Sequence, residues 1–243
     1  RNGKIIYNKN FGYHTYEKLK KVTDSSVYDV ASLTKILATL PLIIQDVSSK
    51  KINLNTKIGE LLPKWNNSNK ANITLKEMLS HYGRLKPWIP FYKETLDRNG
   101  NPKRKFYNLR YSRSHSLRVF DNFFLKNKYE KNIINQIKES ELIDESKREF
   151  YEWKNNYSDL PYYILKEYLE MTKNNDLDVL VKKNIYSPLG LKYTTYNPKS
   201  SYSKDLIVPS EIDNYFRKIK LQGDVHDMGA GMLGGVGGHA GIF

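Results

Sequence analysis

Apolar residues recur with a helical period in several stretches of the chain. Residues 160–171 and 177–185 carry apolar side chains three and four positions apart, a spacing typical of amphipathic helices. Residues 58–62 form a shorter helical pattern, which Pro63 ends because proline cannot continue a helix. Thr74 and Glu77 have the spacing of an N-terminal capping box and predict one more helix. A further helical pattern consists of Ile133, Ile134, Ile137 and Leu142.

Shorter extended patterns accompany these helices. Asn2-Gly3 is a hairpin-turn signal, and residues 4–7 and 11–13 predict two strands of a β-hairpin. Residues 86–150 differ in character, since prolines break their early part and charged and aromatic side chains fill the rest. We interpret this segment as an insertion or cap within a single domain spanning residues 1–243. The mixture of elements predicts an α+β fold.

An apolar helix is predicted to begin near Ser32, and its first turn carries two residues that could react together. Ser32 and Lys35 lie three positions apart and therefore share a helix face. A neutral lysine there could accept the serine proton and create a nucleophile. The N-terminus of a buried helix favours negative charge, and a low dielectric favours a neutral lysine. An ordinary N-cap serine is the alternative.

The same four-residue pattern, serine followed three positions later by lysine, occurs twice more. Ser48 with Lys51 and Ser201 with Lys204 both lie in polar, lysine-rich stretches, whereas Ser32 precedes the apolar run of residues 36–44. Only Ser32 is therefore expected at the beginning of a buried helix.

Composition narrows the classes of function. The 243 residues suffice for one large domain or two small ones, and a hydrophobic content of 39% supports a packed core. The absence of cysteine excludes disulfides and thiolate metal sites. Residues 36–44 are too short to cross a membrane and are interrupted by Thr39 and Pro41, so no membrane span is predicted.

The net charge of +14, from 40 basic and 26 acidic residues, raises the question of a polyanionic partner. The lysines are dispersed along the chain, and the densest basic stretch, residues 103–118, is interleaved with Tyr107, Tyr111 and His115. We therefore expect no nucleic-acid partner. Attraction to an anionic substrate or polymer is at least as well supported.

Two further segments could complete a serine site. Tyr157 precedes the helix expected near Leu160 and could transfer a proton to a leaving group. Residues 238–243, Gly-His-Ala-Gly-Ile-Phe, could form a strand that a ligand approaches closely. The alternatives are a packing tyrosine, since the chain has 19, and a glycine-rich turn.

Two other interpretations are rejected. Residues 229–234 match the spacing of a dinucleotide-binding glycine loop, but no βαβ unit can accompany them. Asp224, His226, Asp227 and His239 do not have the spacing of a helical metal pair. We therefore expect neither a metal nor another cofactor.

Taken in order, these segments resemble the serine β-lactamase and penicillin-binding-protein superfamily. The resemblance is strongest to its class C-like branch of esterases, D-aminopeptidases and β-lactamase-related serine hydrolases. Within this branch, the chain looks most similar to the serine hydrolase modules of Bacteroidetes-type bacteria, which are often fused to a family 3 glycosidase. The segments that carry the resemblance are residues 29–35 (DVASLTK), 73–81 (ITLKEMLSH), 157–159 (YSD), 188–191 (PLGL) and 239–241 (HAG).

The resemblance implies a fold and a set of roles. The fold would be an antiparallel sheet flanked by helices, together with an all-helical region. Ser32 would be the acylated nucleophile, Lys35 its proton acceptor and Tyr157 the proton shuttle. His239 and Gly241 would line the substrate strand. The backbone N–H groups of Ser32 and Ile242 would form the oxyanion hole.

Two departures from the family pattern bear on the substrate. Asp159 stands where the family has asparagine, which changes a contact to the substrate amide. His239 stands where lysine is usual, which removes a permanent charge that helps hold a β-lactam carboxylate. Both departures favour an esterase or a D-amino-acid peptidase, or a weak β-lactamase, over a dedicated β-lactamase. A non-catalytic ligand-binding relative and a basic nucleic-acid-binding domain remain the alternative functions.

The resemblance also implies a setting. A small-molecule or peptidoglycan-like ester or amide is expected as substrate, in the periplasm or another extracytoplasmic part of the envelope. The fold family has elements before residue 1 and after residue 243, so the chain is expected to be an incomplete domain, truncated at both ends. Fusion to a glycosidase domain in a longer chain is a further expectation.

Overall fold

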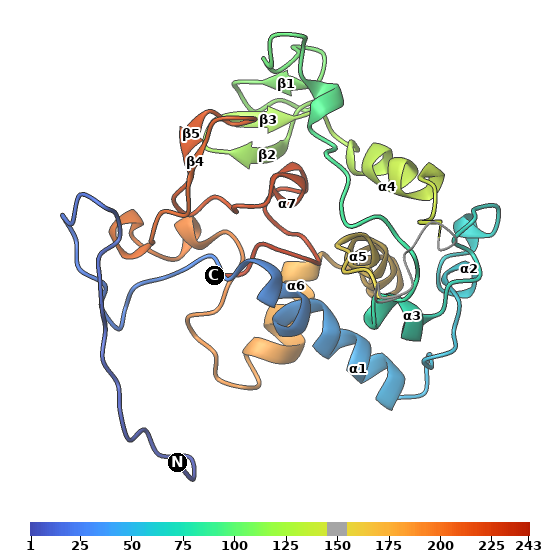
Figure 1. Ribbon diagram of the computed structural model, residues 1–243, viewed down its shortest axis with the longest axis horizontal. Helices are drawn as coiled ribbons and strands as arrows, with labels where there is room; N and C mark the ends of the chain where they lie inside the picture. Colours follow the sequence, from blue (N-terminus) through green and yellow to red (C-terminus); the bar gives the residue numbers. More distant parts are fainter. Residues whose placement is uncertain (145–154) are drawn as a thin grey trace.

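The computed structural model of the protein describes residues 1–144 and 155–243. Its elements are mixed, and the predicted α+β class is confirmed (Figure 1). One antiparallel sheet has the strand order β1-β3-β2, and a two-stranded sheet pairs β4 with β5. The strands are β1 (Tyr107–Asn108), β2 (Leu117–Phe120), β3 (Phe123–Leu125), β4 (Ile212–Asp213) and β5 (Ile219–Lys220).

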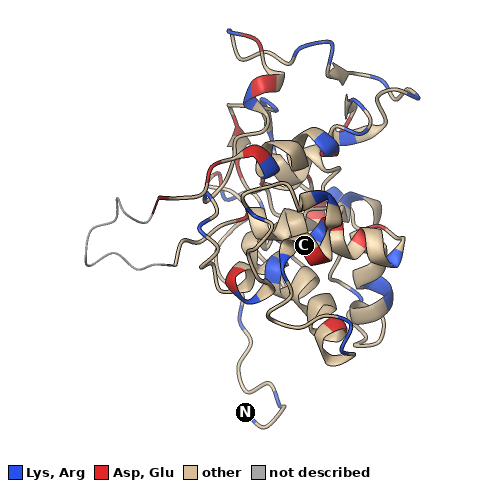
Figure 2. Ribbon diagram, turned by 90° about the vertical axis from the view of Figure 1, so that its right-hand side faces the viewer, with Lys and Arg blue, Asp and Glu red and all other residues tan. Residues whose placement is uncertain are grey.

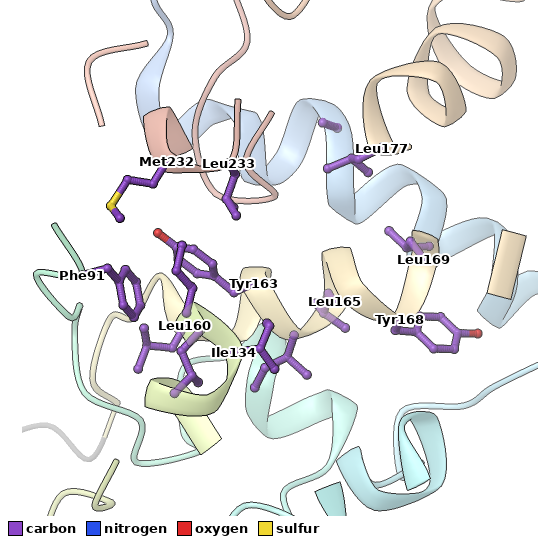
Figure 3. Packing of buried hydrophobic residues seen from close by; sticks show 14 of the residues in the cluster. Phe91, Ile134, Leu160, Tyr163, Leu165, Tyr168, Leu169, Leu177, Met232 and Leu233 are labelled. Carbon is purple, nitrogen blue, oxygen red and sulfur yellow. The ribbon is translucent and has the colours of Figure 1, made fainter. Parts of the chain in front are cut away.

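Helix α5 (Leu160–Lys173) lies at the centre of the helical part, where its apolar face is buried (Figure 1). It packs against α4 (Glu130–Glu139), α6 (Leu177–Val181) and the π-helical turn Lys35–Thr39. Figure 3 shows Leu160, Tyr163 and Leu165 of α5 among side chains from these neighbours. Fully burying one such leucine stabilises the fold by about 2 kcal/mol. The predicted helix at 160–171 is confirmed, and that at 177–185 is confirmed as α6 followed by the π-helical turn Lys182–Tyr186.

The helix that carries Ser32 is built from three pieces. A 3₁₀ turn at Ala31–Leu33 leads into the π-helical turn Lys35–Thr39 and then into α1 (Leu40–Ser48). Pro41 lies in the first turn of α1, where a missing N–H is tolerated. Proline cannot donate to the carbonyl four residues earlier, and that Leu37 carbonyl instead accepts from the Tyr186 hydroxyl at 3.1 Å. The helix therefore continues through Pro41, and its hydrogen-bond pattern changes from π to α at Leu40.

The capping box is also confirmed. Glu77 N–H donates to Thr74 Oγ1 at 3.2 Å, and Thr74 N–H donates to Glu77 Oε2 at 2.8 Å. These two bonds begin α3 (Leu75–Leu79), which lies near α2 (Ile58–Leu61) and the 3₁₀ turn Pro63–Trp65 in Figure 1.

The predicted N-terminal hairpin is wrong. Residues 4–7 and 11–12 form no strand, and the nearest pairing is a single antiparallel bridge between Tyr13 and Lys21. Ile5 and Ile6 are 84% and 79% exposed, so the alternating pattern buries nothing here. A lone two-stranded hairpin is marginal in water. No strand among the described residues lies beside it to add a third.

The segment 86–144 contains the 3₁₀ turn Lys93–Thr95, the three-stranded sheet and α4. Strand β2 packs against α7 (Met228–Met232), which joins this segment to the C-terminal part of the chain. Its interpretation as an insertion or cap stays a prediction, and its residues 145–150 lie outside the described residues.

Lysines and arginines are scattered over elements throughout the molecule, with acidic residues between them (Figure 2). Within residues 1–144 and 155–243, the helices are all too short or too polar to cross a membrane.

Candidate active site

Ser32 and Lys35 meet as their spacing predicts. Lys35 Nζ donates to Ser32 Oγ at 2.9 Å, and Ser32 itself lies on the surface. Lys35 is only 3% exposed, which is rare for a lysine. Burial of an amine beside an accessible hydroxyl is the arrangement in which a lysine can exchange a proton with a serine.

The buried lysine is held by two further polar groups. Asp159 Oδ1 lies 2.7 Å from Lys35 Nζ, and the His239 carbonyl oxygen lies 3.4 Å from it. The rings of Tyr157 and Tyr162 cover the amine, with their centroids 4.9 and 5.5 Å from Nζ. This shell fixes Nζ between Ser32 and Asp159.

The backbone before Ser32 adopts a conformation that non-glycine residues rarely take. Ala31 has φ +47°. Its N–H donates to Asp29 Oδ1 at 2.8 Å, while Asp29 Oδ2 accepts from His226 N–H at 2.6 Å. Burial raises the pKa of Asp29 above its ordinary value, although these two bonds oppose the shift. Asp29 thus ties the Ser32 turn to the loop before α7.

The Ser32 N–H donates to no acceptor among residues 1–144 and 155–243. It lies at the beginning of the helix, where backbone N–H groups are free to bind an anion. This group is therefore available to an oxyanion.

An open cleft of about 520 Å³ gives access to Ser32. Most of its wall is apolar, and its polar lining consists mainly of Ser32, Lys35, His81 and the Tyr157 and Tyr162 rings. Burial lowers the pKa of His81, and the nearby charge of Lys35 lowers it further, while Asp159 opposes both effects. A neutral imidazole is thus favoured next to the lysine.

Tyr157 lies beside the lysine but is not joined to the serine. Its ring packs against His81 with 4.6 Å between ring centroids, and the residue is 54% exposed. No hydrogen bond of its hydroxyl links it to Ser32 in the part of the chain that the structure describes. The structure therefore brings Tyr157 to the same cleft, with its hydroxyl still free to turn toward a ligand.

Residues 238–243 run along the other side of the Ser32 turn. Val30 N–H donates to the Ile242 carbonyl at 3.0 Å, and Ile242 N–H donates to Thr34 Oγ1 at 3.1 Å. Phe243 exchanges backbone hydrogen bonds with Thr195. The strand predicted at 238–243 is therefore wrong: residues 238–240 form a bend, and Ile242 makes a single antiparallel bridge with Tyr196. The Ile242 N–H expected in the oxyanion hole donates to Thr34 instead.

Gly241 is required by this arrangement. It has φ +125°, and a Cβ there would lie 2.3 Å from the Gly235 carbonyl oxygen. Any other residue would clash with backbone. The glycine therefore allows this segment to pack closely against the backbone at Gly235.

The imidazole of His239 lies away from the cleft. It is buried, stacks on Tyr163 with 4.3 Å between ring centroids, and its Nε2 lies 2.8 Å from Asp227 Oδ1. Burial alone would raise the pKa of Asp227, but His239 and the N–H of Ala230 outweigh it and lower the pKa to about 2. His239 thus faces the lysine only through its carbonyl, while its side chain holds the segment 238–243 against the beginning of α7.

Three residues that shape the site were not predicted from the sequence to do so: Thr34, Tyr162 and Asp29. Thr34 lies inside the Ser-x-x-Lys pattern and its burial could have marked it. Tyr162 is one tyrosine among many and carried no signal. Asp224, His226 and Asp227 form no metal-ligand cluster in the described part, since Asp224 pairs with Lys199 at 2.7 Å and Asp227 with His239.

Comparisons with known proteins agree with this geometry. A family model described as Beta-lactamase matches residues 1–206. A provisionally named D-alanyl-D-alanine carboxypeptidase of Escherichia coli is 26% identical over 269 residues, covering 100% of this chain and 55% of its own length. A protein of the same name from Salmonella gallinarum is 28% identical, covering 92% of this chain and 49% of its own length. The chain thus spans about half the length of the curated relatives it matches.

Solved structures show the same fold. FmtA from Staphylococcus aureus superposes with a TM-score of 0.63 at 19% identity, over 99% of this chain and 55% of that one. A beta-lactamase/D-alanine carboxypeptidase from Yersinia pestis gives a TM-score of 0.60 at 18% identity, over 97% of this chain and 55% of that one. With the family match over most of its residues, the chain belongs to the β-lactamase family.

Proposed function

We propose that the protein is a serine hydrolase that cleaves an ester or amide through an acyl-enzyme on Ser32. The observation that carries the proposal is the 2.9 Å hydrogen bond between buried Lys35 and the accessible Ser32 hydroxyl. The other two lysines of the Ser-x-x-Lys patterns are exposed.

In the first step Ser32 Oγ attacks the substrate carbonyl carbon while its proton passes to Lys35 Nζ. Lys35 must then be in its amine form, with the proton of the Lys35–Asp159 pair held on the Asp159 carboxyl. The carbonyl oxygen becomes an oxyanion and accepts from the Ser32 N–H. When the tetrahedral intermediate collapses, the bond to the leaving group breaks. The leaving group takes a proton from the site, with Tyr157 as the group placed to relay it.

In the second step a water molecule attacks the acyl carbon, and its proton returns through the same groups. The bond to Ser32 Oγ then breaks, and the serine recovers its proton as the acid product leaves. Asp159 keeps Lys35 Nζ in place throughout, because its Oδ1 lies 2.7 Å from the amine.

The names of the curated relatives support a D-alanyl peptide or a related peptidoglycan-like ester or amide as substrate class. The buried imidazole of His239 supplies no charge to the cleft, which favours esterase or peptidase activity over dedicated β-lactam hydrolysis. An extracytoplasmic location belongs to the same proposal.

A covalent serine probe tests this proposal. Wild-type protein is incubated with a fluorophosphonate and with fluorescent penicillin, beside Ser32→Ala as the matched control. Label on wild type that is absent from Ser32→Ala supports the acyl-enzyme. Wild-type protein that takes no label and leaves ester and D-alanyl peptide substrates intact would overturn it.

A second candidate is a non-catalytic relative that binds ligands in the same cleft. The observation that favours it is the Ile242 N–H, which donates to Thr34 Oγ1 instead of facing the cleft. One oxyanion donor in place of two would cost about 3 kcal/mol of transition-state stabilisation. Saturable substrate binding without turnover would favour this candidate.

A further inference from the structure

The three-stranded sheet β1-β3-β2 lies within the most basic segment of the chain, residues 103–128. Figure 1 shows this sheet at the upper edge of the molecule, away from α1. None of the residues that line the Ser32 cleft belongs to this segment. The surface of the sheet therefore takes no part in the proposed catalysis.

Hydrogen bonds bring three parts of this segment to one end of the sheet. The Lys126 N–H, directly after β3, donates to the Phe106 carbonyl, directly before β1, at 2.8 Å. The Asn127 side chain donates to the Arg113 carbonyl at 2.7 Å. The loop 109–116 is thus fastened to the end of β3, and the basic residues of all three parts are gathered there.

The exposed basic side chains form a patch, the basic patch, made of Arg104, Lys105, Arg110, Arg113, Lys126 and Lys128. No ion pair involves any of them within residues 1–144 and 155–243. Between residues 98 and 129 the sole acidic residue is Asp121, and it pairs with Lys199. The next one along the chain, Glu130, lies 3.0 Å from Lys166. The charge of the basic patch is therefore not neutralised by these carboxylates.

Two large apolar side chains are exposed in the same loop. Leu109 is 71% exposed and Tyr111 is 69% exposed, and they flank Arg110 in the sequence. The Tyr111 ring contacts the Phe124 ring of β3 in a T-shaped arrangement, with 6.0 Å between centroids. An exposed leucine between basic residues suits a surface that offers both negative charge and hydrocarbon.

This combination favours an anionic bilayer over a nucleic acid or a soluble phosphate polymer. Single-stranded nucleic acids stack on aromatic rings with free faces, whereas Tyr107 and Phe123 are buried and stack on each other with 4.6 Å between centroids. A phosphate polymer would pair with the basic side chains but offers no hydrocarbon to Leu109. A bilayer supplies anionic headgroups for the basic residues and an interfacial layer in which tyrosine is favoured.

We propose that the basic patch, together with Leu109 and Tyr111, docks the protein on the surface of an anionic phospholipid bilayer. The contact is peripheral, with Leu109 and Tyr111 entering the headgroup layer and the lipid phosphates accepting hydrogen bonds from arginine and lysine. The inference goes beyond the proposed function and does not depend on Ser32. The basic patch and the Ser32 cleft share no residue, so docking and hydrolysis use separate surfaces.

Vesicle binding at low salt tests the role of the charge. Co-sedimentation is measured with vesicles of equal parts phosphatidylglycerol and phosphatidylcholine, and with phosphatidylcholine alone. Binding should be at least about tenfold stronger to the anionic vesicles, because each basic residue near such a surface contributes about fivefold. Lys126→Gln with Lys128→Gln should weaken that binding by about tenfold or more.

A matched pair of lysines outside the patch is the control. Lys182 and Lys183 are both exposed, so Lys182→Gln with Lys183→Gln removes the same charge from another surface. This control should weaken binding by less than about threefold. An equal loss in the two double variants, or no binding of the wild type to anionic vesicles, would overturn the proposal.

A fluorescent label tests whether the loop enters the bilayer. The chain has no cysteine, so one introduced cysteine can carry a polarity-sensitive nitrobenzoxadiazole group. Leu109→Cys is labelled beside Leu189→Cys, whose native leucine is 68% exposed and lies outside the patch. On anionic vesicles the emission should shift to the blue at residue 109 and stay unchanged at residue 189. A bound protein whose label at 109 remains in water would overturn bilayer docking and point to a soluble polyanion.

Discussion

Two copies of the same four-residue pattern lie a short distance apart on one helix. At its beginning, Lys35 is buried and donates to Ser32 Oγ at 2.9 Å. Past its end, Lys51 is 65% exposed and lies 3.8 Å from Asp46, and Ser48 is an exposed residue of the last turn. The residue types and their spacing are identical, so the difference between the two segments comes from their surroundings.

The surroundings of Ser32 come from distant parts of the chain. Asp159 and the Tyr157 and Tyr162 rings enclose the lysine, and Ile242 of the segment 238–243 donates its N–H to Thr34. The Lys51 side chain, in contrast, is mostly exposed, with the Asp46 carboxylate 3.8 Å from its amine. Hence a buried lysine, and not the spacing itself, distinguishes a candidate nucleophile from a surface serine.

The largest expected effect comes from removing the two serine hydroxyls. Ser32→Ala should reduce kcat/KM for an activated ester by about 10³-fold or more, because the nucleophile is lost. Ser48→Ala should leave kcat/KM within twofold. Steady-state hydrolysis of a p-nitrophenyl ester checks both. Equal activity of wild type and Ser32→Ala would remove the distinction between the segments.

The lysines come next. Lys35→Met keeps the length of the side chain and should reduce kcat/KM by about 10²- to 10³-fold, the range of a lost general base. Lys51→Met should have no measurable effect. The assay is the same ester hydrolysis, with thermal unfolding as the check that both variants fold. Full activity of a folded Lys35→Met variant would show that another group accepts the serine proton.

A smaller loss is expected from the proton relay. Tyr157→Phe removes only the hydroxyl and should reduce kcat by about 10- to 10²-fold. Tyr111→Phe, also at an exposed tyrosine, is the matched control and should behave as wild type. The reduction should be larger for an alkyl ester than for p-nitrophenyl esters, whose leaving group needs no proton. An equal effect on both substrates would argue against a relay.

The packing around Ser32 can be tested through stability. Thr34→Val leaves the buried Ile242 N–H without its acceptor and should lower the free energy of unfolding by about 2 kcal/mol. Lys50→Ala changes the equivalent position of the Ser48 pattern and should alter it by less than about 0.5 kcal/mol. Urea denaturation measures both. A Thr34→Val variant as stable as wild type would mean that this N–H finds another acceptor.

The smallest expected effect comes from the pair between Asp227 and His239, which holds the segment 238–243 in place. The folded-state pKa of Asp227 is about 2, below its ordinary 3.8, so its stabilising contribution is complete above about pH 4 and is lost as the pH falls through about 2. Because the carboxylate is partly exposed, the expected contribution is about 1 kcal/mol. Asp227→Asn should flatten the decrease of unfolding free energy between about pH 4 and pH 2. An unchanged slope would show that the pair with His239 does not stabilise the fold.

The elements that depend on residues close together in the sequence could be predicted from local patterns. The capping box at Thr74 and helix α5 follow from the spacing of neighbouring residues, and both were predictable. The N-terminal hairpin was not, because an alternating pattern specifies a strand only where other strands cover it.

The candidate site divides in the same way. The contact between Ser32 and Lys35 is local and was predicted. The orientation of the His239 imidazole toward Asp227, and the hydrogen bond from Ile242 to Thr34, join segments far apart in sequence. Such contacts depend on how the segment 238–243 packs against the rest of the chain, which no local spacing encodes.

The most direct test of the central claim is the site of covalent attachment. Wild-type protein is labelled with a fluorophosphonate and digested. Mass spectrometry then measures modification in the peptides that contain each of the three Ser-x-x-Lys serines. Modification of Ser32 at one equivalent, with Ser48 and Ser201 unmodified, is the predicted result. Modification of Ser48 or Ser201 at a rate equal to that of Ser32, or of none of them, would contradict the account.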